Sequence, residues 1–130
     1  MNPVLLLLAV VLAIFVVAKV IASRPRMPAT AAYQAVQQNT AVVIDVREPE
    51  EWREGVAAPA VLLPLSDLRG ARSRWKPFLA KNRDKQIFVY CHSGMRSSAV
   101  ARTLCREGFN AVNLGGFSAW TRAGLPVRNP

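Results

Sequence analysis

The chain has 130 residues and a formal net charge of +9, with 17 lysines and arginines against 8 acidic residues. This length has room for one domain and a short appendage. Two cysteines are too few for a disulfide scaffold; with a single histidine and no common ligand spacing, no metal site is expected either.

The first segment of the chain is a candidate membrane anchor. An apolar run from Val4 to Ala18 continues past Lys19 through Val20-Ile21-Ala22. As a helix the segment is about 28 Å long, close to the ~30 Å of a bilayer core. Lys19 lies near its end, where the ammonium can reach the headgroups. We therefore expect residues 1–22 to form a single-pass anchor that contacts the membrane through residues 3–22.

A cleaved signal peptide is the alternative, because Val20-Ile21-Ala22 before Ser23 resembles a cleavage site. The charged flanks favour the anchor. No basic residue precedes the apolar run, whereas Lys19, Arg24 and Arg26 follow it. Since basic residues mark the cytoplasmic flank, the domain is expected in the cytoplasm; cleavage near Ser23 would instead export it.

The rest of the chain divides into a linker at residues 23–28, rich in proline and arginine, and a domain at residues 29–130. Strands are predicted at 41–44, 61–63, 86–90 and 111–114. Helices are predicted at 30–38 with Thr30 as cap, at 48–55, from Ser66 or Asp67, around Trp75, at 97–107, and at 117–123 with Trp120 inward, after a tight turn at Gly115-Gly116. This alternation predicts an α/β fold, a parallel sheet with helices on both faces, which binds ligands at the carboxyl ends of its strands.

Six residues, Cys91-His92-Ser93-Gly94-Met95-Arg96, lie between a predicted strand and the helix predicted from Ser97. A helix N-terminus and a nearby cation lower the pKa of a thiol from its usual ~8.5. Main-chain N–H groups can also point at the sulfur, since Gly94 permits a tight turn. The pattern predicts an accessible, activated thiol at Cys91, with Arg96 either binding an anionic substrate or bracing the loop.

This loop, continued to Ser97, resembles the active-site loop of rhodanese-like sulfurtransferases. Further segments that resemble family signatures are Val43-Ile44-Asp45-Val46-Arg47-Glu48 with Glu51-Trp52, Pro64-Leu65, Gly115-Gly116-Phe117 with Trp120, and Gly124-Leu125-Pro126-Val127. The resemblance covers about Ala29 to Val127. It implies a rhodanese-like domain behind the anchor.

The resemblance implies a membrane-anchored thiosulfate sulfurtransferase. Cys91 would be the catalytic nucleophile, taking a sulfane sulfur from a small anion such as thiosulfate, or from another donor, and passing it as a persulfide to a thiol or protein acceptor. The substrate-binding loop would be His92, Ser93, Gly94, Met95, Arg96 and Ser97, whose main-chain N–H groups would stabilise the persulfide. No metal or organic cofactor is implied.

Three other functions stay open. The domain could relay a persulfide received from a partner protein, or serve as a binding or sensing module without turnover. A cysteine phosphatase or arsenate reductase is disfavoured, because related phosphatases resemble Cys-x5-Arg whereas four residues separate Cys91 from Arg96.

Several residues near the site have structural interpretations. Asp45 and Arg47 follow the first strand as structural support, and Arg47 is expected to pair with Glu50 or Glu51. Cys105 is expected in the core.

One segment departs from the family pattern. Many members have Gly-His-Ile-Pro-Gly-Ala where this chain has Gly55-Val56-Ala57-Ala58-Pro59-Ala60. The missing histidine, at about Val56, predicts a change in loop packing. His92, the histidine that is present, is expected to tune the mouth of the pocket.

Basic residues gather between positions 69 and 85, opposed only by Asp84: Arg69, Arg72, Arg74, Lys76, Lys81, Arg83 and Lys85. They form either solvated helix faces or a surface that attracts anionic lipid. No nucleic-acid partner is expected, because the stretch lacks a recognisable reading motif.

Overall fold

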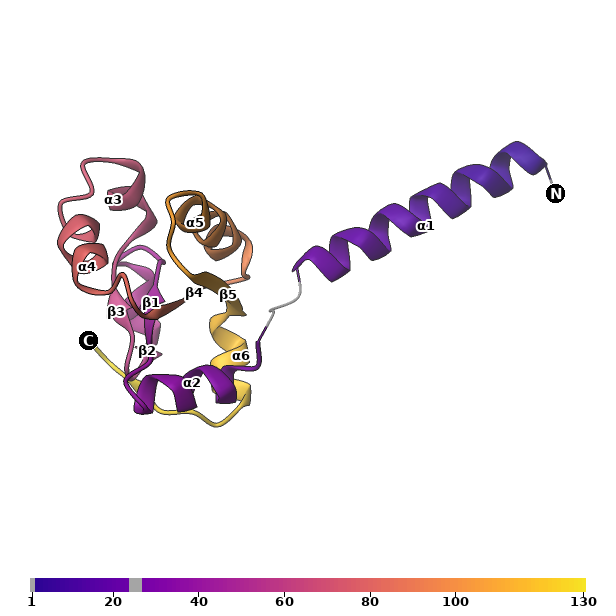
Figure 1. The fold of residues 1–130 in the computed structure, drawn as a ribbon. Coiled ribbons are helices and arrows are strands. Elements are labelled where there is room, and N and C mark those ends of the chain that lie inside the picture. Colours follow the sequence, from indigo (N-terminus) through magenta and orange to yellow (C-terminus); the bar gives the residue numbers. More distant parts are fainter. Residues whose placement is uncertain (1, 24–26) are drawn as a thin grey trace.

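The computed structural model describes residues 2–23 and 27–130, so residues 24–26 of the predicted linker lie outside the described residues. The predicted α/β fold is confirmed: a parallel sheet has helices on both faces (Figure 1). The strand order is β3-β1-β4-β5, with bounds Val61–Leu62, Ala41–Asp45, Gln86–Cys91 and Ala111–Gly116. Because β1 and β4 are adjacent and in register from Ala41 with Gln86 to Asp45 with Tyr90, the residues that follow them meet at one edge.

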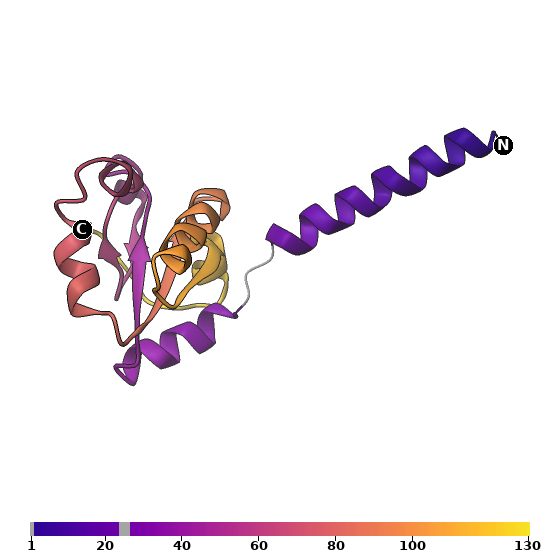
Figure 2. The same cartoon turned by 45° about the horizontal axis from the view of Figure 1, so that its top comes forward.

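Side chains alternate between the two faces of the sheet, as expected for strands. Ile44 and Val89 point into one buried cluster, and Val43 and Phe88 into the other. The first cluster is covered by α3 (Leu65–Arg69), α4 (Trp75–Lys81) and α5 (Met95–Arg106). The second is covered by α2 (Ala29–Gln37) and α6 (Phe117–Arg122). Figures 1 and 2 show these helices on their opposite faces.

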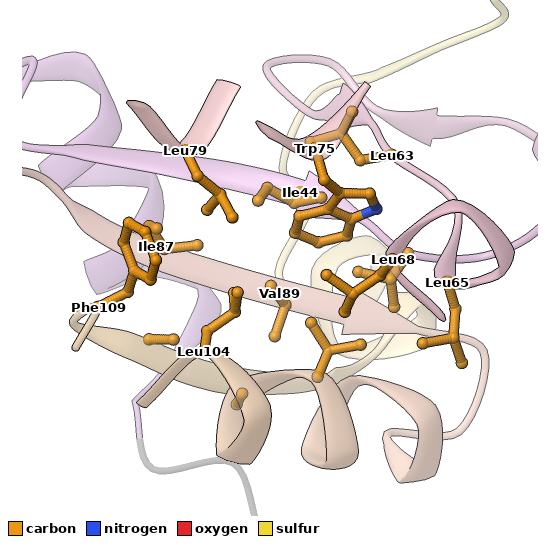
Figure 3. Packing of buried hydrophobic residues seen from close by; sticks show 14 of the residues in the cluster. Ile44, Leu63, Leu65, Leu68, Trp75, Leu79, Ile87, Val89, Leu104 and Phe109 are labelled. Carbon is orange, nitrogen blue, oxygen red and sulfur yellow. The ribbon is translucent and has the colours of Figure 1, made fainter. Parts of the chain in front are cut away.

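Two tryptophans occupy the two clusters, as the sequence predicted. The indole of Trp75 lies beside Ile44 in Figure 3 and is fully buried, and its Nε1 donates to the carbonyl oxygen of Pro64 at 2.9 Å. Trp120 is also buried, and its Nε1 donates to Pro126 O at 2.8 Å. Each ring removes a large apolar surface from water while its polar atom keeps a partner.

Helix beginnings differ from the predictions because their caps were assigned to the wrong residues. Helix α2 begins at Ala29 after Pro28, and no side chain caps it. Asp67 lies inside α3, and its carboxylate instead accepts the N–H groups of Ser73, Arg74 and Trp75 at the start of α4. Asp67 therefore supports the next helix rather than its own.

The segments around the sheet also differ in detail. The predicted helix at 48–55 is a 3₁₀ turn, η1 (Glu51–Glu54). Strand β5 continues through Gly115-Gly116, where a tight turn was expected.

The segment that lacks the family histidine forms a strand that was not predicted. β2 (Val56–Ala57) pairs antiparallel with β6 (Val127–Arg128) near the C-terminus. The Arg128 guanidinium donates to the carbonyl oxygens of Ala58 and Ala60 at 2.9 Å each. The last residues of the chain are thereby fastened to this segment.

The N-terminal helix α1 (Pro3–Ser23) includes an apolar stretch, Pro3–Ile21, with a mean hydropathy of 3.2 and none of it buried. By length and composition it could cross a membrane or act as a signal sequence.

Part of the basic stretch at 69–85 has partners within the domain. Arg72 forms a bidentate ion pair with Glu107, and Lys85 Nζ donates to Asn39 Oδ1 at 2.8 Å. The guanidinium of Arg83 lies 5.0 Å from the ring centre of Phe109. These contacts give ordinary structural roles to three of the seven cations, all three in the turns between α3, α4 and β4 rather than on helix faces.

Candidate active-site loop

The predicted loop lies at the carboxyl edge of the sheet, between β4 and α5. β4 ends at Cys91, and α5 begins at Met95 rather than at Ser97 as predicted. Gly94 precedes the helix with φ of 92°, a conformation that glycine adopts without strain. The earlier start brings Ser97 into the first turn, where its main-chain N–H has no partner within the helix and can face the loop.

Three hydrogen-bond donors lie within reach of the Cys91 sulfur in this arrangement. Its Sγ lies 3.0 Å from the N–H nitrogen of Gly94, 3.4 Å from that of Ser97 and 3.3 Å from the Ser97 hydroxyl oxygen. The residue is 0% exposed and packs in the cluster beneath α5. The prediction that the Cys91 thiol is accessible is therefore wrong for the resting loop, because the side chain turns inward under the start of the helix.

Two opposing effects act on the pKa of Cys91. Burial raises it, but hydrogen bonds from the Ser97 hydroxyl and from the main-chain amides of Ser97, Gly94 and Ser93 outweigh burial, and the pKa is lowered. Hydrogen bonds to the charged form stabilise the thiolate directly. The loop thus favours the reactive form of a thiol that solvent does not reach.

Two glycines let β5 approach this loop closely. A Cβ on Gly116 would lie 2.4 Å from the carbonyl oxygen of His92, and one on Gly94 would lie 3.1 Å from Gly115 Cα. Since real Cβ atoms do not approach main-chain oxygen at 2.4 Å, a side chain at Gly116 would displace the loop.

The Arg96 side chain is bound to Glu51, a pairing that the sequence did not reveal. Its Nη1 and Nη2 lie 2.6 Å and 2.8 Å from the two carboxylate oxygens. Hydrogen bonds from Arg96, the largest influence, lower the pKa of Glu51 to about 2 against the effect of burial. Of the two interpretations of Arg96, this contact favours bracing of the loop, against the 3₁₀ turn η1.

Arg47 pairs with Asp45 and not with the carboxylate of Glu50 or Glu51, so the predicted pairing is wrong. Both side chains are 0% exposed, and the Arg47 Nη2 to Asp45 Oδ2 distance is 2.8 Å. Arg47 also donates to the carbonyl oxygens of Glu51 and Gly55 at 3.3 Å and 2.8 Å. The buried pair therefore holds the η1 turn in place beside β1, which supports the predicted structural role.

The remaining loop residues lie at the surface. His92, Ser93 and Met95 are exposed, Met95 by 77%. This position agrees with the expectation that His92 lies at the mouth of the site.

Asn113 contacts the loop but was not among the predicted site residues. Its Oδ1 lies 2.7 Å from the Ser97 hydroxyl oxygen, and its Nδ2 donates to Gly94 O at 3.1 Å. No sequence motif marks it, because it stands in the middle of an ordinary strand.

Cys105 is exposed, and the expectation that it lies in the core is wrong. On α5 the buried positions are Ser97, Val100, Ala101 and Leu104. Cys105 lies beside this stripe, and its Sγ contacts Ala111 O at 3.3 Å.

Comparisons with known proteins agree with this fold. A family model described as a rhodanese-like domain matches residues 28–123. Among solved structures, a rhodanese-related protein from Thermoplasma volcanium is 34% identical with a TM-score of 0.67, over 82% of this chain and 99% of that one. A protein of unknown function from Rhodopseudomonas palustris, described as a possible tyrosine phosphatase, is 26% identical with a TM-score of 0.64, over 82% and 86%.

A third similar structure, a thiosulfate sulfurtransferase from Pseudomonas aeruginosa, shares the fold at 21% identity and a TM-score of 0.67, over 82% of this chain and 20% of that one. The family model spans most of the described domain, from before α2 to the end of α6. The chain belongs to the rhodanese-like domain family.

Proposed function

We propose that the chain is a sulfurtransferase in which Cys91 carries sulfur as a persulfide. The observation that supports this most directly is the set of three donors around Sγ, at 3.0 to 3.4 Å, which stabilise a thiolate. The family membership supports the same class of reaction.

In the proposed first step, the Cys91 thiolate attacks the sulfane sulfur of thiosulfate. A bond forms between Sγ and that sulfur, and the bond within thiosulfate breaks, so that sulfite leaves with the electron pair. In the second step an acceptor thiolate, or cyanide in an assay, attacks the outer sulfur and Sγ leaves as thiolate. Neither step needs a further oxidant or reductant.

The loop residues have separate roles in this proposal. The main-chain N–H groups from His92 to Ser97 stabilise the charge on the outer sulfur, as donors in a water-poor site do. Arg96, held by Glu51, keeps the loop closed around one sulfur atom. Because only four residues separate Cys91 from Arg96, the loop fits a single sulfur atom better than a tetrahedral phosphate.

We further propose that residues 1–22 anchor the protein, that residues 23–28 link the anchor to the domain at 29–130, and that the domain lies in the cytoplasm. The support is the apolar stretch Pro3–Ile21 and the basic residues that follow it, since basic residues mark the cytoplasmic flank of a span.

The test is thiocyanate formation from thiosulfate and cyanide by the full chain in detergent. Cys91→Ala is expected to abolish it, whereas Cys105→Ser, which changes an exposed thiol outside the loop, is the matched control and retains it. Turnover that survives Cys91→Ala would contradict the proposal.

The same samples separate the other candidates. A relay would show little thiosulfate turnover but a mass increase of about 32 Da, one sulfur atom, on Cys91. A binding module would show neither activity nor adduct, and would keep its partner in Cys91→Ala. Hydrolysis of a phosphate monoester that depends on Cys91 would favour a phosphatase.

A further inference from the structure

Asn113, on β5, connects three groups around the Cys91 loop. Its Oδ1 accepts the Gly115 N–H at 2.9 Å and lies 2.7 Å from the Ser97 hydroxyl oxygen. Its Nδ2 donates to the carbonyl oxygen of Gly94 at 3.1 Å. The same Gly94 and Ser97 are hydrogen-bond donors to Cys91 Sγ.

The orientation of this amide follows from its neighbours. Exchanging Oδ1 with Nδ2 would place an NH₂ group against the N–H of Gly115 and an oxygen against the carbonyl of Gly94. Both hydrogen bonds would be lost. Oδ1 is therefore the atom that faces Ser97, and it can only accept.

The Ser97 hydroxyl has one proton, and its nearest acceptors are Asn113 Oδ1 at 2.7 Å and Cys91 Sγ at 3.3 Å, with the Gly115 carbonyl oxygen at 3.4 Å. When Cys91 is a thiol, its S–H can donate to the Ser97 oxygen while Ser97 donates to Asn113, and every group is satisfied. When Cys91 is a thiolate, the sulfur can only accept, and it is stabilised if the Ser97 proton turns away from Asn113.

The charge on sulfur moves during the proposed reaction, on which this inference rests. Before loading, the negative charge is on Sγ; after loading, it is on the outer sulfur, about 2 Å farther away. Sγ then carries little negative charge and gains little from a hydrogen bond donated by the Ser97 hydroxyl. We propose that Asn113 is a positioning residue whose Oδ1 accepts the hydrogen bond of the Ser97 hydroxyl when Cys91 carries sulfur and gives it up to Sγ when Cys91 is a free thiolate.

This arrangement balances the two forms of the site. Without Asn113, the Ser97 hydroxyl keeps its hydrogen bond to Sγ, which favours the free thiolate over the persulfide. With Asn113, the hydroxyl has a good acceptor in either form. The residue thus helps the same cysteine both to accept sulfur and to give it away.

A double-mutant cycle tests the proton exchange. In the full chain carrying Cys105→Ser, so that Cys91 is its one thiol, the thiolate pKa of Cys91 is measured from the pH dependence of alkylation by iodoacetamide. S97A is expected to raise this pKa by about one unit, the size of a hydrogen bond to a charged group. The pKa shift caused by N113A is then measured twice, once with Ser97 present and once in the S97A background. The shift with Ser97 present is expected to be lower by about half a unit than the shift in the S97A background.

The sign of this difference separates the proposal from a purely structural role. If Asn113 only braced Gly94, N113A would raise the pKa, and equally in both backgrounds. Equal shifts, or a difference of the opposite sign, would overturn the inference. N110A is the matched control, because the Asn110 amide bonds to Gln86 and not to the loop; it is expected to leave the pKa unchanged.

A second measurement tests the loaded form. The same variants are equilibrated with thiosulfate and sulfite, and the ratio of persulfide to free protein is read from intact mass. N113A is expected to lower this ratio about threefold, the equivalent of half a pKa unit, and to have no such effect in the S97A background. An unchanged ratio of persulfide to free protein would contradict the inference. Absence of the adduct from every sample would instead contradict the proposed function, and the pKa measurements would then decide the role of Asn113.

Discussion

Arg96 and Glu51, which are 45 positions apart in the chain, form a bidentate ion pair with N–O distances of 2.6 Å and 2.8 Å. The pair joins the first turn of α5 to the η1 turn after β1. Both side chains are about one third exposed, 35% for Arg96 and 31% for Glu51, so solvent weakens the pair.

The pH dependence of stability follows from this pair. Because the pKa of Glu51 is lowered from 4.5 to about 2 in the folded protein, its contribution is fully present above the unfolded value and is lost as the pH falls from about 4.5 to 2. Glu51→Gln is expected to lower the free energy of unfolding at neutral pH by less than about 1 kcal/mol. Unfolding monitored by circular dichroism should show the difference between the two proteins disappearing by about pH 2; a constant difference would contradict this assignment.

The buried pair of Asp45 and Arg47 should matter far more for stability. Arg47→Met removes one partner and leaves an uncompensated carboxylate in the interior, which is expected to cost about 3–5 kcal/mol. The double variant Asp45→Asn with Arg47→Met, which removes both charges, should recover part of this loss. Urea unfolding at pH 7 measures both, and a double variant as unstable as the sum of its single variants would show that the two side chains act independently.

Gly116→Ala should disable the loop through a steric clash. Its Cβ would lie 2.4 Å from His92 O, and a displacement of the loop by about 1 Å is enough to reduce catalysis as much as a hundredfold. Sulfur transfer is expected to fall at least about tenfold.

Gly108→Ala provides the matched control, because Gly108 has φ of 93° and, among the described residues beyond its chain neighbours, nothing lies within 4 Å of an added Cβ. It should cost about 1 kcal/mol of stability from backbone strain and leave activity unchanged. Equal losses of activity in the two variants would contradict a specific clash at the loop.

If residues 1–22 are an anchor, as proposed, the protein purified from membranes begins at residue 1 and resists extraction by alkaline carbonate. A variant lacking residues 1–26 should be released in soluble form and retain sulfur transfer, since the hydrogen-bond donors around Cys91 all belong to the domain. Mass spectrometry and fractionation test this directly. A mature chain that begins at Ser23 would favour the signal peptide.

The parts of the fold that the sequence predicted are those determined by local pattern. The β-branched run before Asp45 and the run before Cys91 are buried on both faces of the sheet, and they became the central strands β1 and β4. The loop between Cys91 and Arg96 was recognisable because its residues are contiguous. The sequence predicts the helix after it two residues late, because the loop motif continues to Arg96 although the turn ends at Gly94.

The contacts that the sequence did not reveal are long-range ones. Glu51 with Arg96, and Ser97 with Asn113, join segments that only the folded sheet brings together. A local rule could have suggested the pair of Asp45 and Arg47, since residues two apart near a strand end can share a face. The strands β2 and β6 were too short, at two residues each, to show any alternation.

The burial of Cys91 also limits the covalent partners available to the protein. A disulfide and a persulfide both place a second sulfur atom about 2.05 Å from Sγ, and Cys91 is 0% exposed, so a small movement of the loop can admit a reagent the size of thiosulfate or iodoacetamide but not the bulk around the cysteine of a folded protein. A sulfur atom already bound to Cys91 stands one bond farther out and can be removed without that approach. Under oxidation, cross-linking between molecules should therefore occur through the exposed Cys105, and the loop protects its thiol from capture by other proteins.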